Sequence, residues 1–300
     1  MSDLTIPSTR HTPSEFFLFR YQLFVDYHNF QTTTDGPQTA NELYKARNEI
    51  MKLIIEALPS ASETDKLNYS IQQKKSESQY LLIAQENRTK TVIQNQEDYS
   101  VLHQPYVWIA IDMSDNVQTI AISSRGDLHA KHVATKLTEK LQRLLKKRDL
   151  DIQVHEIKIT SSFWNYAKSN EGQIKEVGFI VCPPNMPGLT EAFDREISQY
   201  AKGTNAKQAE IIVKAGRNDT LILNEQDTKL QVLANYSEAG GGDYYFKTVG
   251  SKKRVRPLNV QQSIVASPIQ EKSLLPPDTK SNKVSIFSKL RQLCAIKRKK

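Results

Sequence analysis

The order of segments between Val117 and Gly216 is the sequence feature that most limits how this chain can fold. Short runs of β-branched and aromatic residues predict strands, and apolar residues three or four positions apart predict helices. The patterns are a strand at 117–123, a helix at 128–149, strands at 152–160 and 174–182, a helix at 189–202 and a strand at 208–215. The order is therefore strand, helix, strand, strand, helix, strand.

That order matches the split βαβ, or ferredoxin-like, plan, in which an antiparallel sheet carries both helices on one face. We therefore expect an α+β protein with a mainly antiparallel sheet and a ferredoxin-like βαββαβ core. A general α+β sheet that contains the same elements in another order is the alternative.

The residues before this stretch are rich in strand patterns. Residues 15–27 are an aromatic run, typical of a strand that is buried on at least one face. A helix is expected at 42–58, and Asn41 is suited to cap its start. Further strand patterns follow at 67–72, 79–85, 89–94 and 105–113. We therefore expect residues 1–116 to be a sheet-rich N-terminal part of the core.

After Gly216 the sequence has two parts, a patterned segment up to residue 257 and a polar segment after it. A helix at 225–236 and a hairpin at 244–256 are expected to complete an α+β core at 117–257. From Leu258 the composition shifts to Gln, Ser, Pro and Lys, which is typical of disorder. We therefore expect a disordered, flexible basic tail at 258–300, with the pattern of a basic amphipathic helix near its end.

The charge is distributed unevenly along the chain. The whole sequence has 41 Lys and Arg against 33 Asp and Glu, a net charge of +8. From Lys247 to Lys300 there are 14 Lys and Arg against 2 Asp and Glu, so this segment carries +12 and the first 246 residues carry −4. Such a concentration of positive charge indicates a partner that is a polyanion, either nucleic acid or an anionic membrane surface.

Two basic segments are the candidates for contact with nucleic acid, because Lys and Arg bind phosphates without regard to sequence. The predicted contact residues are Lys247, Lys252, Lys253, Arg254 and Arg256 in the hairpin, and Lys297, Arg298, Lys299 and Lys300 in the tail. The alternative is a solvated hairpin whose aromatic residues pack on the core, and a tail that only adds solubility. The cations of helix 128–149 could extend the same surface, although such cations are ordinarily the solvent side of an amphipathic helix.

One constellation has the residue types of a nuclease. Glu156 and Lys158 form a Glu-x-Lys pair on one face of a predicted strand, where they and Asp112 would hold Mg²⁺ and orient a water molecule. Such pairs are also common on exposed sheet faces, so Asp112, Glu156 and Lys158 are retained only as an alternative catalytic set. The six histidines have no metal-ligand spacing with cysteine, and the sequence predicts neither a metal site nor a cofactor.

The remaining totals favour a cytoplasmic protein. No apolar run reaches the roughly 18 residues that a membrane span needs, and the first residues lack the pattern of a secretory signal. Cys182 and Cys294 lie far apart in the sequence and suggest no disulfide framework.

Residues 105–257 contain a pattern with a family resemblance. The strand in VGFIVCPPNMPG ends at Pro184-Asn185-Met186-Pro187, and a helix, the strand AEIIVKAG, another helix and a polar hairpin follow. This layout resembles the uncharacterised bacterial domain-of-unknown-function-4747 family. It is also similar in layout to the phage lambda exclusion protein A and other phage-defence proteins. The resemblance implies a bacterial or prophage protein that acts in antiviral defence, and it implies no catalytic residues.

The charge distribution and this resemblance together predict a non-enzymatic nucleic-acid-binding protein of bacterial antiphage defence, with DNA as the expected partner. One alternative is a Mg²⁺-dependent nuclease effector. Another is a protein-interaction or membrane-associated subunit of a defence complex, in which the tail binds a partner protein or an anionic membrane.

Overall fold

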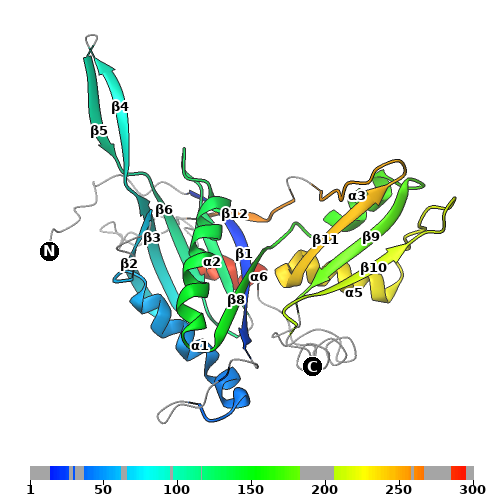
Figure 1. Ribbon diagram of the computed structural model, residues 1–300, viewed down its shortest axis with the longest axis horizontal. Coiled ribbons are helices and arrows are strands. Elements are labelled where there is room, and N and C mark those ends of the chain that lie inside the picture. Colours follow the sequence, from blue (N-terminus) through cyan, green and yellow to red (C-terminus); the bar gives the residue numbers. More distant parts are fainter. Residues whose placement is uncertain are drawn as a thin grey trace, which may run out of the picture.

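The structure is a computed structural model, and it describes most of the chain. The described residues are 14–26, 30, 37–61, 66–94, 97–115, 117–182, 206–257, 260–266 and 285–294; of Lys90, 92–94 and 97–99 only the backbone is described. They form an α+β fold with mainly antiparallel sheets, which confirms the predicted class (Figure 1).

The larger sheet has seven strands, and every pairing within it is antiparallel. Its strands are β1 (Ser14–Val25), β2 (Leu67–Ser76), β3 (Gln79–Glu86), β6 (Tyr106–Asp112), β7 (Thr119–Ser123), β8 (Leu150–Glu156) and β12 (Ser263–Ala266). The order is β12-β1-β7-β6-β3-β2, with β8 also paired to β1. The aromatic N-terminal strand β1 is therefore the centre of the sheet, because it pairs with β7, β8 and β12.

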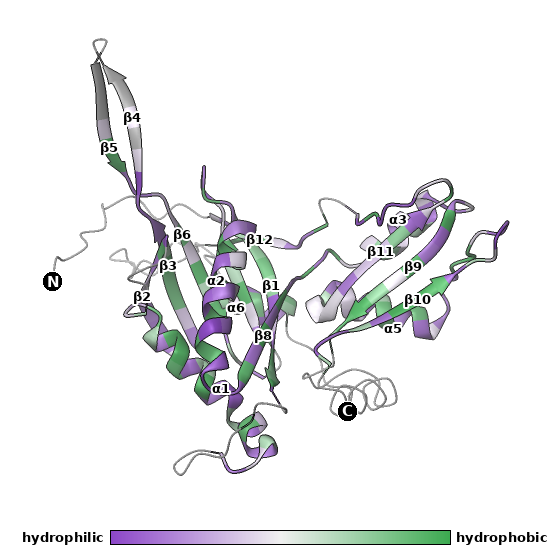
Figure 2. Cartoon of the chain, viewed as in Figure 1, coloured by the Kyte–Doolittle hydropathy of each residue, from purple (hydrophilic) through white to green (hydrophobic). Residues whose placement is uncertain are grey.

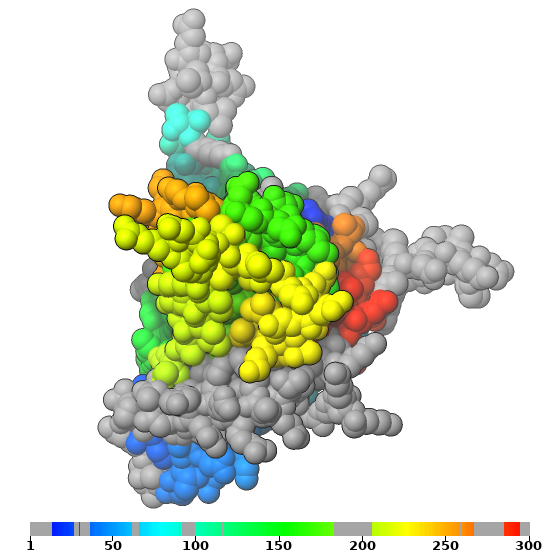
Figure 3. All heavy atoms as spheres, turned by 90° about the vertical axis from the view of Figure 1, so that its right-hand side faces the viewer, coloured from blue at the N-terminus to red at the C-terminus, as the bar shows by residue number. Residues whose placement is uncertain are grey.

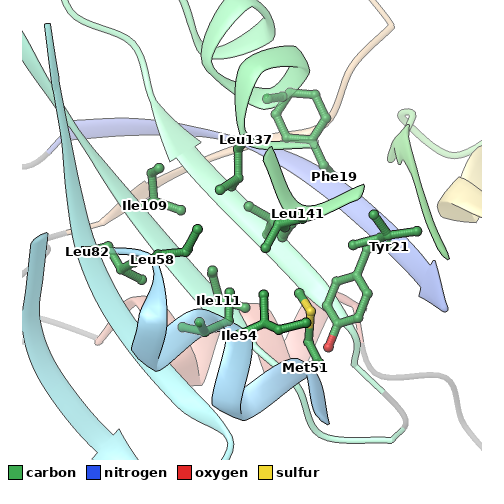
Figure 4. Close-up of a cluster of buried hydrophobic side chains, with 14 of the residues drawn as sticks. Phe19, Tyr21, Met51, Ile54, Leu58, Leu82, Ile109, Ile111, Leu137 and Leu141 are labelled. Atoms are coloured by element: carbon green, nitrogen blue, oxygen red, sulfur yellow. The ribbon is translucent and has the colours of Figure 1, made fainter. Parts of the chain in front are cut away.

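Helices cover both faces of this sheet. On one face lie α1 (Ala40–Ala57) and α2 (Ala130–Lys146), whose apolar sides meet alternate residues of the strands. Figure 4 shows this core, in which Met51 and Leu58 of α1, Leu137 of α2 and Ile109 of β6 lie close together. On the other face α6 (Ile286–Cys294) packs on Phe16, Leu18 and Trp108.

A two-stranded hairpin extends from the larger sheet. Its strands β4 (Arg88–Gln94) and β5 (Glu97–His103) pair with each other and continue the direction of β3 and β6 (Figure 1). The strands predicted at 67–72, 79–85, 89–94 and 105–113 are therefore confirmed, whereas β5 was not predicted.

A second sheet has three strands in the order β10-β9-β11, with β9 (Ile174–Val181) between β10 (Ala209–Lys214) and β11 (Gly242–Thr248). Two helices, α3 (Ser162–Ser169) and α5 (Thr228–Tyr236), pack on one face of it around Phe163 and Phe179. Figure 2 shows the apolar residues in green on these strands, and Figure 3 presents the surface of this part of the chain in green to orange.

The predicted single ferredoxin-like sheet is wrong. Strands β7 and β8 belong to the larger sheet, whereas β9 and β10 belong to the second one. The physical reason is that the pairing partners come from outside the stretch 117–216: β1 pairs with β7 and β8, and β11 pairs with β9. The helix predicted at 189–202 lies outside the described residues.

A π-helical turn, η1 (Ser237–Gly241), joins the second sheet to the larger one. The buried carboxylate of Glu238 accepts the backbone N–H groups of Ser161 at 2.9 Å and Phe163 at 2.7 Å, and so satisfies the first turn of α3. Burial raises the pKa of Glu238, although these two N–H groups and Lys158 favour its charged form. From β1, buried Arg20 donates to the carbonyl of Ala239, which fixes η1 to the larger sheet.

The predicted disordered tail is wrong for two of its segments. Strand β12 pairs with β1, and α6 buries Phe287 and Leu290 against the larger sheet. Arg20 also donates to the carbonyl of Cys294 at 2.8 Å and holds the end of α6. The remaining tail residues, at 258–259, 267–284 and 295–300, lie outside the described part of the chain.

Candidate nucleic-acid interface

Helix α2 presents a row of cations at the surface. Its apolar residues, among them Leu137 and Leu141, are buried against the larger sheet, so most of its polar positions face outward. Figure 2 shows purple, hydrophilic segments along the exposed side of α2. Arg143 and Lys146 lie in the last turn, where the helix dipole favours positive charge. This helix was predicted at 128–149 from its periodicity, and its N-cap is His129.

A groove of about 610 Å³ lies between this side of α2 and the start of β2. Its lining residues are Lys66, Leu67, Tyr69, Lys136, Glu139, Lys140, Gln142, Arg143 and Lys146. Five of them are Lys or Arg and one is acidic, so the lining has a net charge of +4. We call this feature the α2–β2 groove.

The cations of the α2–β2 groove differ in how they are held. Lys140 is 5% exposed, and its ammonium group donates to the carbonyl of Ala61, in the turn that follows α1. Lys136 donates to Glu139 at 2.9 Å, so the single acid of the groove is already paired. Lys66 and Lys146 are exposed, and neither forms an ion pair with any residue that the structure describes. The groove therefore retains positive charge that is not neutralised.

The length of the basic row suits a nucleic-acid backbone. From Lys136 to Lys146 the helix rises about 15 Å at about 1.5 Å per residue. That distance equals roughly four base-pair steps of a duplex at about 3.4 Å each. The cations of α2 were predicted from the sequence but Lys66 was not, because only the fold places the residue before β2 beside α2.

The hairpin predicted to contact nucleic acid is present, since Phe246 and Val255 form an antiparallel bridge. Three of its five cations have acidic partners: Lys247 pairs with Glu176 at 2.8 Å, Arg254 with Glu210 at 3.0 Å and Arg256 with Asp243 at 2.6 Å. Lys252 and Lys253 are exposed at the turn. The hairpin therefore offers less free positive charge than its sequence suggested.

The predicted tail contacts Lys297, Arg298, Lys299 and Lys300 lie outside the described residues. Arg291, nearer the described end of the chain, approaches Asp112 at 3.8 Å from α6.

The alternative catalytic set is divided in the structure. Asp112 is fully buried, and its carboxylate accepts hydrogen bonds from Gln79 at 2.5 Å and from the backbone of Ser114 at 3.0 Å. Glu156 and Lys158 instead line a cleft of about 920 Å³ near the junction of the two sheets, and Asp112 is not part of that lining. The structure therefore brings Glu156 and Lys158 together without Asp112.

Lys158 is engaged within its own surroundings. Its ammonium group pairs with Asp243 and lies 3.9 Å from the centre of the Tyr244 ring. Burial opposes ionisation of Asp243, but Lys158, together with Arg256, holds the pKa of that carboxyl below its usual value. Glu156 forms a separate pair with Lys131 at 2.7 Å. No group of three or more His, Cys, Asp or Glu side chains in the described ranges is placed to hold a metal ion.

Comparisons with known proteins add no relative. No family model, no curated protein and no solved structure matches the chain. The resemblance to the domain-of-unknown-function-4747 family therefore remains a prediction from the sequence pattern. Within the described residues no helix is long and apolar enough to cross a membrane.

Proposed function

We propose that this chain binds nucleic acid through the α2–β2 groove, without cleaving it. The observation that supports the proposal is the groove's lining, in which five cations from α2 and the start of β2 accompany one acid. Solvent-facing cations on a single helix are ordinary, but here a second segment contributes Lys66 to the same groove.

The expected contact is with phosphates rather than with base edges. The groove is lined mainly by lysines, which act as flexible point charges, and contains a single arginine. Base discrimination depends on paired hydrogen bonds of the kind that Arg, Asn and Gln make in a groove of the duplex. We therefore expect binding that is sensitive to salt and weakly dependent on sequence.

The biological setting is proposed on a separate basis. An action on DNA in bacterial antiphage defence rests on the resemblance of residues 105–257 and not on the groove. The nuclease alternative combined Asp112 with Glu156 and Lys158, and Asp112 is not in the cleft that those two residues line. Asp243 does line this cleft, but its carboxylate is already paired with Lys158 and Arg256.

The test is a fluorescence-anisotropy titration of the full chain with a short DNA duplex at salt concentrations between about 50 and 200 mM. If the groove contacts about four phosphates, the logarithm of the affinity falls with the logarithm of salt with a slope of about −3 to −4. The variant Lys66→Glu/Lys146→Glu should weaken binding at least tenfold, because it reverses two exposed charges of the groove.

Two matched controls carry the same change in charge. Lys45→Glu/Lys229→Glu reverses two exposed lysines away from the groove and should leave the affinity within about threefold, since screened charges act locally. Lys252→Glu/Lys253→Glu tests the hairpin. Absence of binding at low salt would contradict the proposed function. Loss of binding in the hairpin variant alone would place the interface on the hairpin and contradict the role of the groove.

A further inference from the structure

Strand β10 leaves an open edge on the second sheet. Within the described residues it pairs with β9 alone, and Figure 1 shows it as the outer strand, with β9 between it and β11. Its pairing with β9 is regular from Ala209 to Lys214, without a register shift. Ile212 and Val213 are 40% and 37% exposed, so apolar side chains accompany this edge on both faces.

Strand β2, at one edge of the larger sheet, is protected in a way that β10 is not. Strand β2 has two register shifts, between Ile71 and Gln73 and between Lys74 and Ser76. Irregular pairing and lysine side chains are the ordinary means by which an outer strand avoids pairing with another chain. Strand β10 has no register shift of this kind, so its outer edge is suited to pairing with a strand of another chain.

The backbone groups that face the open edge can be assigned from the pairing with β9. The N–H of Ala215 donates to the carbonyl of Lys175 at 2.9 Å, and bonded positions alternate along an antiparallel strand. Ile211 and Val213 therefore bond to β9. The N–H and C=O groups of Glu210, Ile212 and Lys214 point away from β9, and no described residue provides them with a backbone partner.

We propose that β10 pairs with β10 of a second copy of this chain, antiparallel and centred on Ile212. That arrangement sets Glu210 of each copy opposite Lys214 of the other, and it sets the two Ile212 residues opposite each other. Opposite charges directly across a strand pair stabilise it, and like charges destabilise it. The sequence of this strand is thus complementary to itself in the antiparallel direction.

The register that places opposite charges across from each other also places the outward-facing backbone groups across from each other. Glu210, Ile212 and Lys214 are the residues whose backbone faces outward, so the proposed pairs are all hydrogen-bonded pairs, with about six bonds in total. Glu210 already pairs with Arg254 at 3.0 Å and Lys214 with Glu176 at 3.3 Å on the same face. In the dimer the Glu210–Arg254 pair of one copy would lie beside the Lys214–Glu176 pair of the other. The carboxylate of Glu210 would then face the ammonium group of Lys214 across the contact.

The two faces of the joined strands would also be filled. On the helix-covered face, Ile211 of one copy would lie opposite Val213 of the other, and Ile211 already packs on the core around Phe163. On the open face, the Tyr245 ring covers Gly178, the neighbour of Ile212 on β9. The result is one continuous six-stranded sheet in the order β11-β9-β10-β10-β9-β11. A contact of six residues per chain is small, so we expect dissociation in the micromolar range.

The test is sedimentation or light scattering of the full chain at concentrations up to about 100 µM, above the expected dissociation constant. The expected result is a concentration-dependent dimer with twice the chain mass of 34.2 kDa. Ile212→Pro should give a monomer, because proline removes an outward N–H and leaves the bonds to β9 intact. The matched control is Ile222→Pro, at a side chain that is 93% exposed and lies outside β10, and it should leave the dimer unchanged.

A charge exchange makes the test specific for this register and requires no loss of folding. Glu210→Lys alone and Lys214→Glu alone should each be monomeric, because each places like charges opposite one another. An equimolar mixture of the two variants should form a dimer again, since every pair across the contact is then opposite in sign. A monomeric wild-type chain at the highest concentration would overturn the proposal. So would a dimer that persists in Ile212→Pro, or a mixture that stays monomeric.

Discussion

Gly240 lies in η1 where this turn packs closely against Arg20 of the larger sheet. Its φ of +83° lies in the left-handed region, and a Cβ there would lie 2.6 Å from Cβ of Arg20 and 3.2 Å from Cγ1 of Ile157. Only glycine meets both conditions, because other residues add a side chain that has no space. Gly240, the first residue of the Gly240–Gly242 run that precedes the basic hairpin, is therefore needed for packing against the larger sheet.

Gly240→Ala is therefore predicted to lower the free energy of unfolding by roughly 2–4 kcal/mol, from backbone strain and overpacking together. Gly172→Ala is the matched control, because Gly172 has a φ of +73° but a Cβ added there would meet no atom within 4 Å. Gly172→Ala should lower the free energy of unfolding by about 1 kcal/mol, from backbone strain alone. Chemical denaturation of both variants measures the difference, and equal losses would contradict the packing role of Gly240.

His155 lies half-buried between the sheets, with Nε2 at 3.1 Å from Sγ of Cys182. Burial lowers its pKa, and nearby Asp243 and Glu156 only partly oppose that effect, while Lys158 adds to it. The pKa of His155 is therefore lower in the folded chain than the value of 6.5 expected in the unfolded chain. The fold has its full stability at pH values above 6.5 and loses part of it as the pH falls toward the pKa of the folded state.

The free energy of unfolding should accordingly decrease as pH falls below about 6.5, and His155→Gln should show a weaker decrease over the same range. Urea denaturation at a series of pH values tests this. Identical pH profiles for the variant and the wild type would show that His155 is not the residue responsible.

At the scale of the secondary-structure element, α6 shows what the sequence could and could not predict. The spacing of Ile286, Leu290 and Leu293 predicted an amphipathic helix, and a helix is present. Its place on the larger sheet was not predictable, because its contacts with Phe16 and Trp108 join residues more than 170 positions apart. The polar segment before it, typical of disorder, gave no sign that α6 would pack on the core.

The packing of α6 can be measured by two substitutions on the same helix. Phe287→Ala removes a side chain that is 4% exposed and should lower the free energy of unfolding by about 3–4 kcal/mol. Leu293→Ala, at a side chain that is 54% exposed, should change it by no more than about 0.5 kcal/mol. Small effects in both variants would mean that α6 does not contribute to the core and would restore the description of this segment as a free tail.

The ferredoxin-like topology was wrongly predicted for the same reason: pairing between distant strands cannot be read from local patterns. Each strand from β7 to β10 was predicted, because strand patterns are local. Their division between two sheets depends on β1 and β11, which lie outside the stretch that suggested a ferredoxin-like fold. The α2–β2 groove was not predicted for this reason either. Local patterns predicted the cations of α2, but only tertiary contacts place Lys66 beside them.

At the scale of the whole molecule, the charge is arranged differently from the linear sequence. The sequence suggested an acidic body with a basic C-terminal segment, but acids of neighbouring strands pair with three cations of the hairpin. The first 246 residues carry −4 overall, yet they contain the groove whose lining carries +4. Net charge along the chain therefore does not show where cations gather in space, and the proposed polyanion site depends on that gathering.

The central claim is that nucleic acid lies in the α2–β2 groove, and cross-linking tests it most directly. The full chain would be irradiated with a DNA duplex that carries a photoreactive base, and the attached peptides identified by mass spectrometry. We predict attachment within α2 and at residues 66–69, and its loss in Lys66→Glu/Lys146→Glu. Attachment confined to residues 247–256 or to the end of the chain, with α2 unmodified, would contradict the claim.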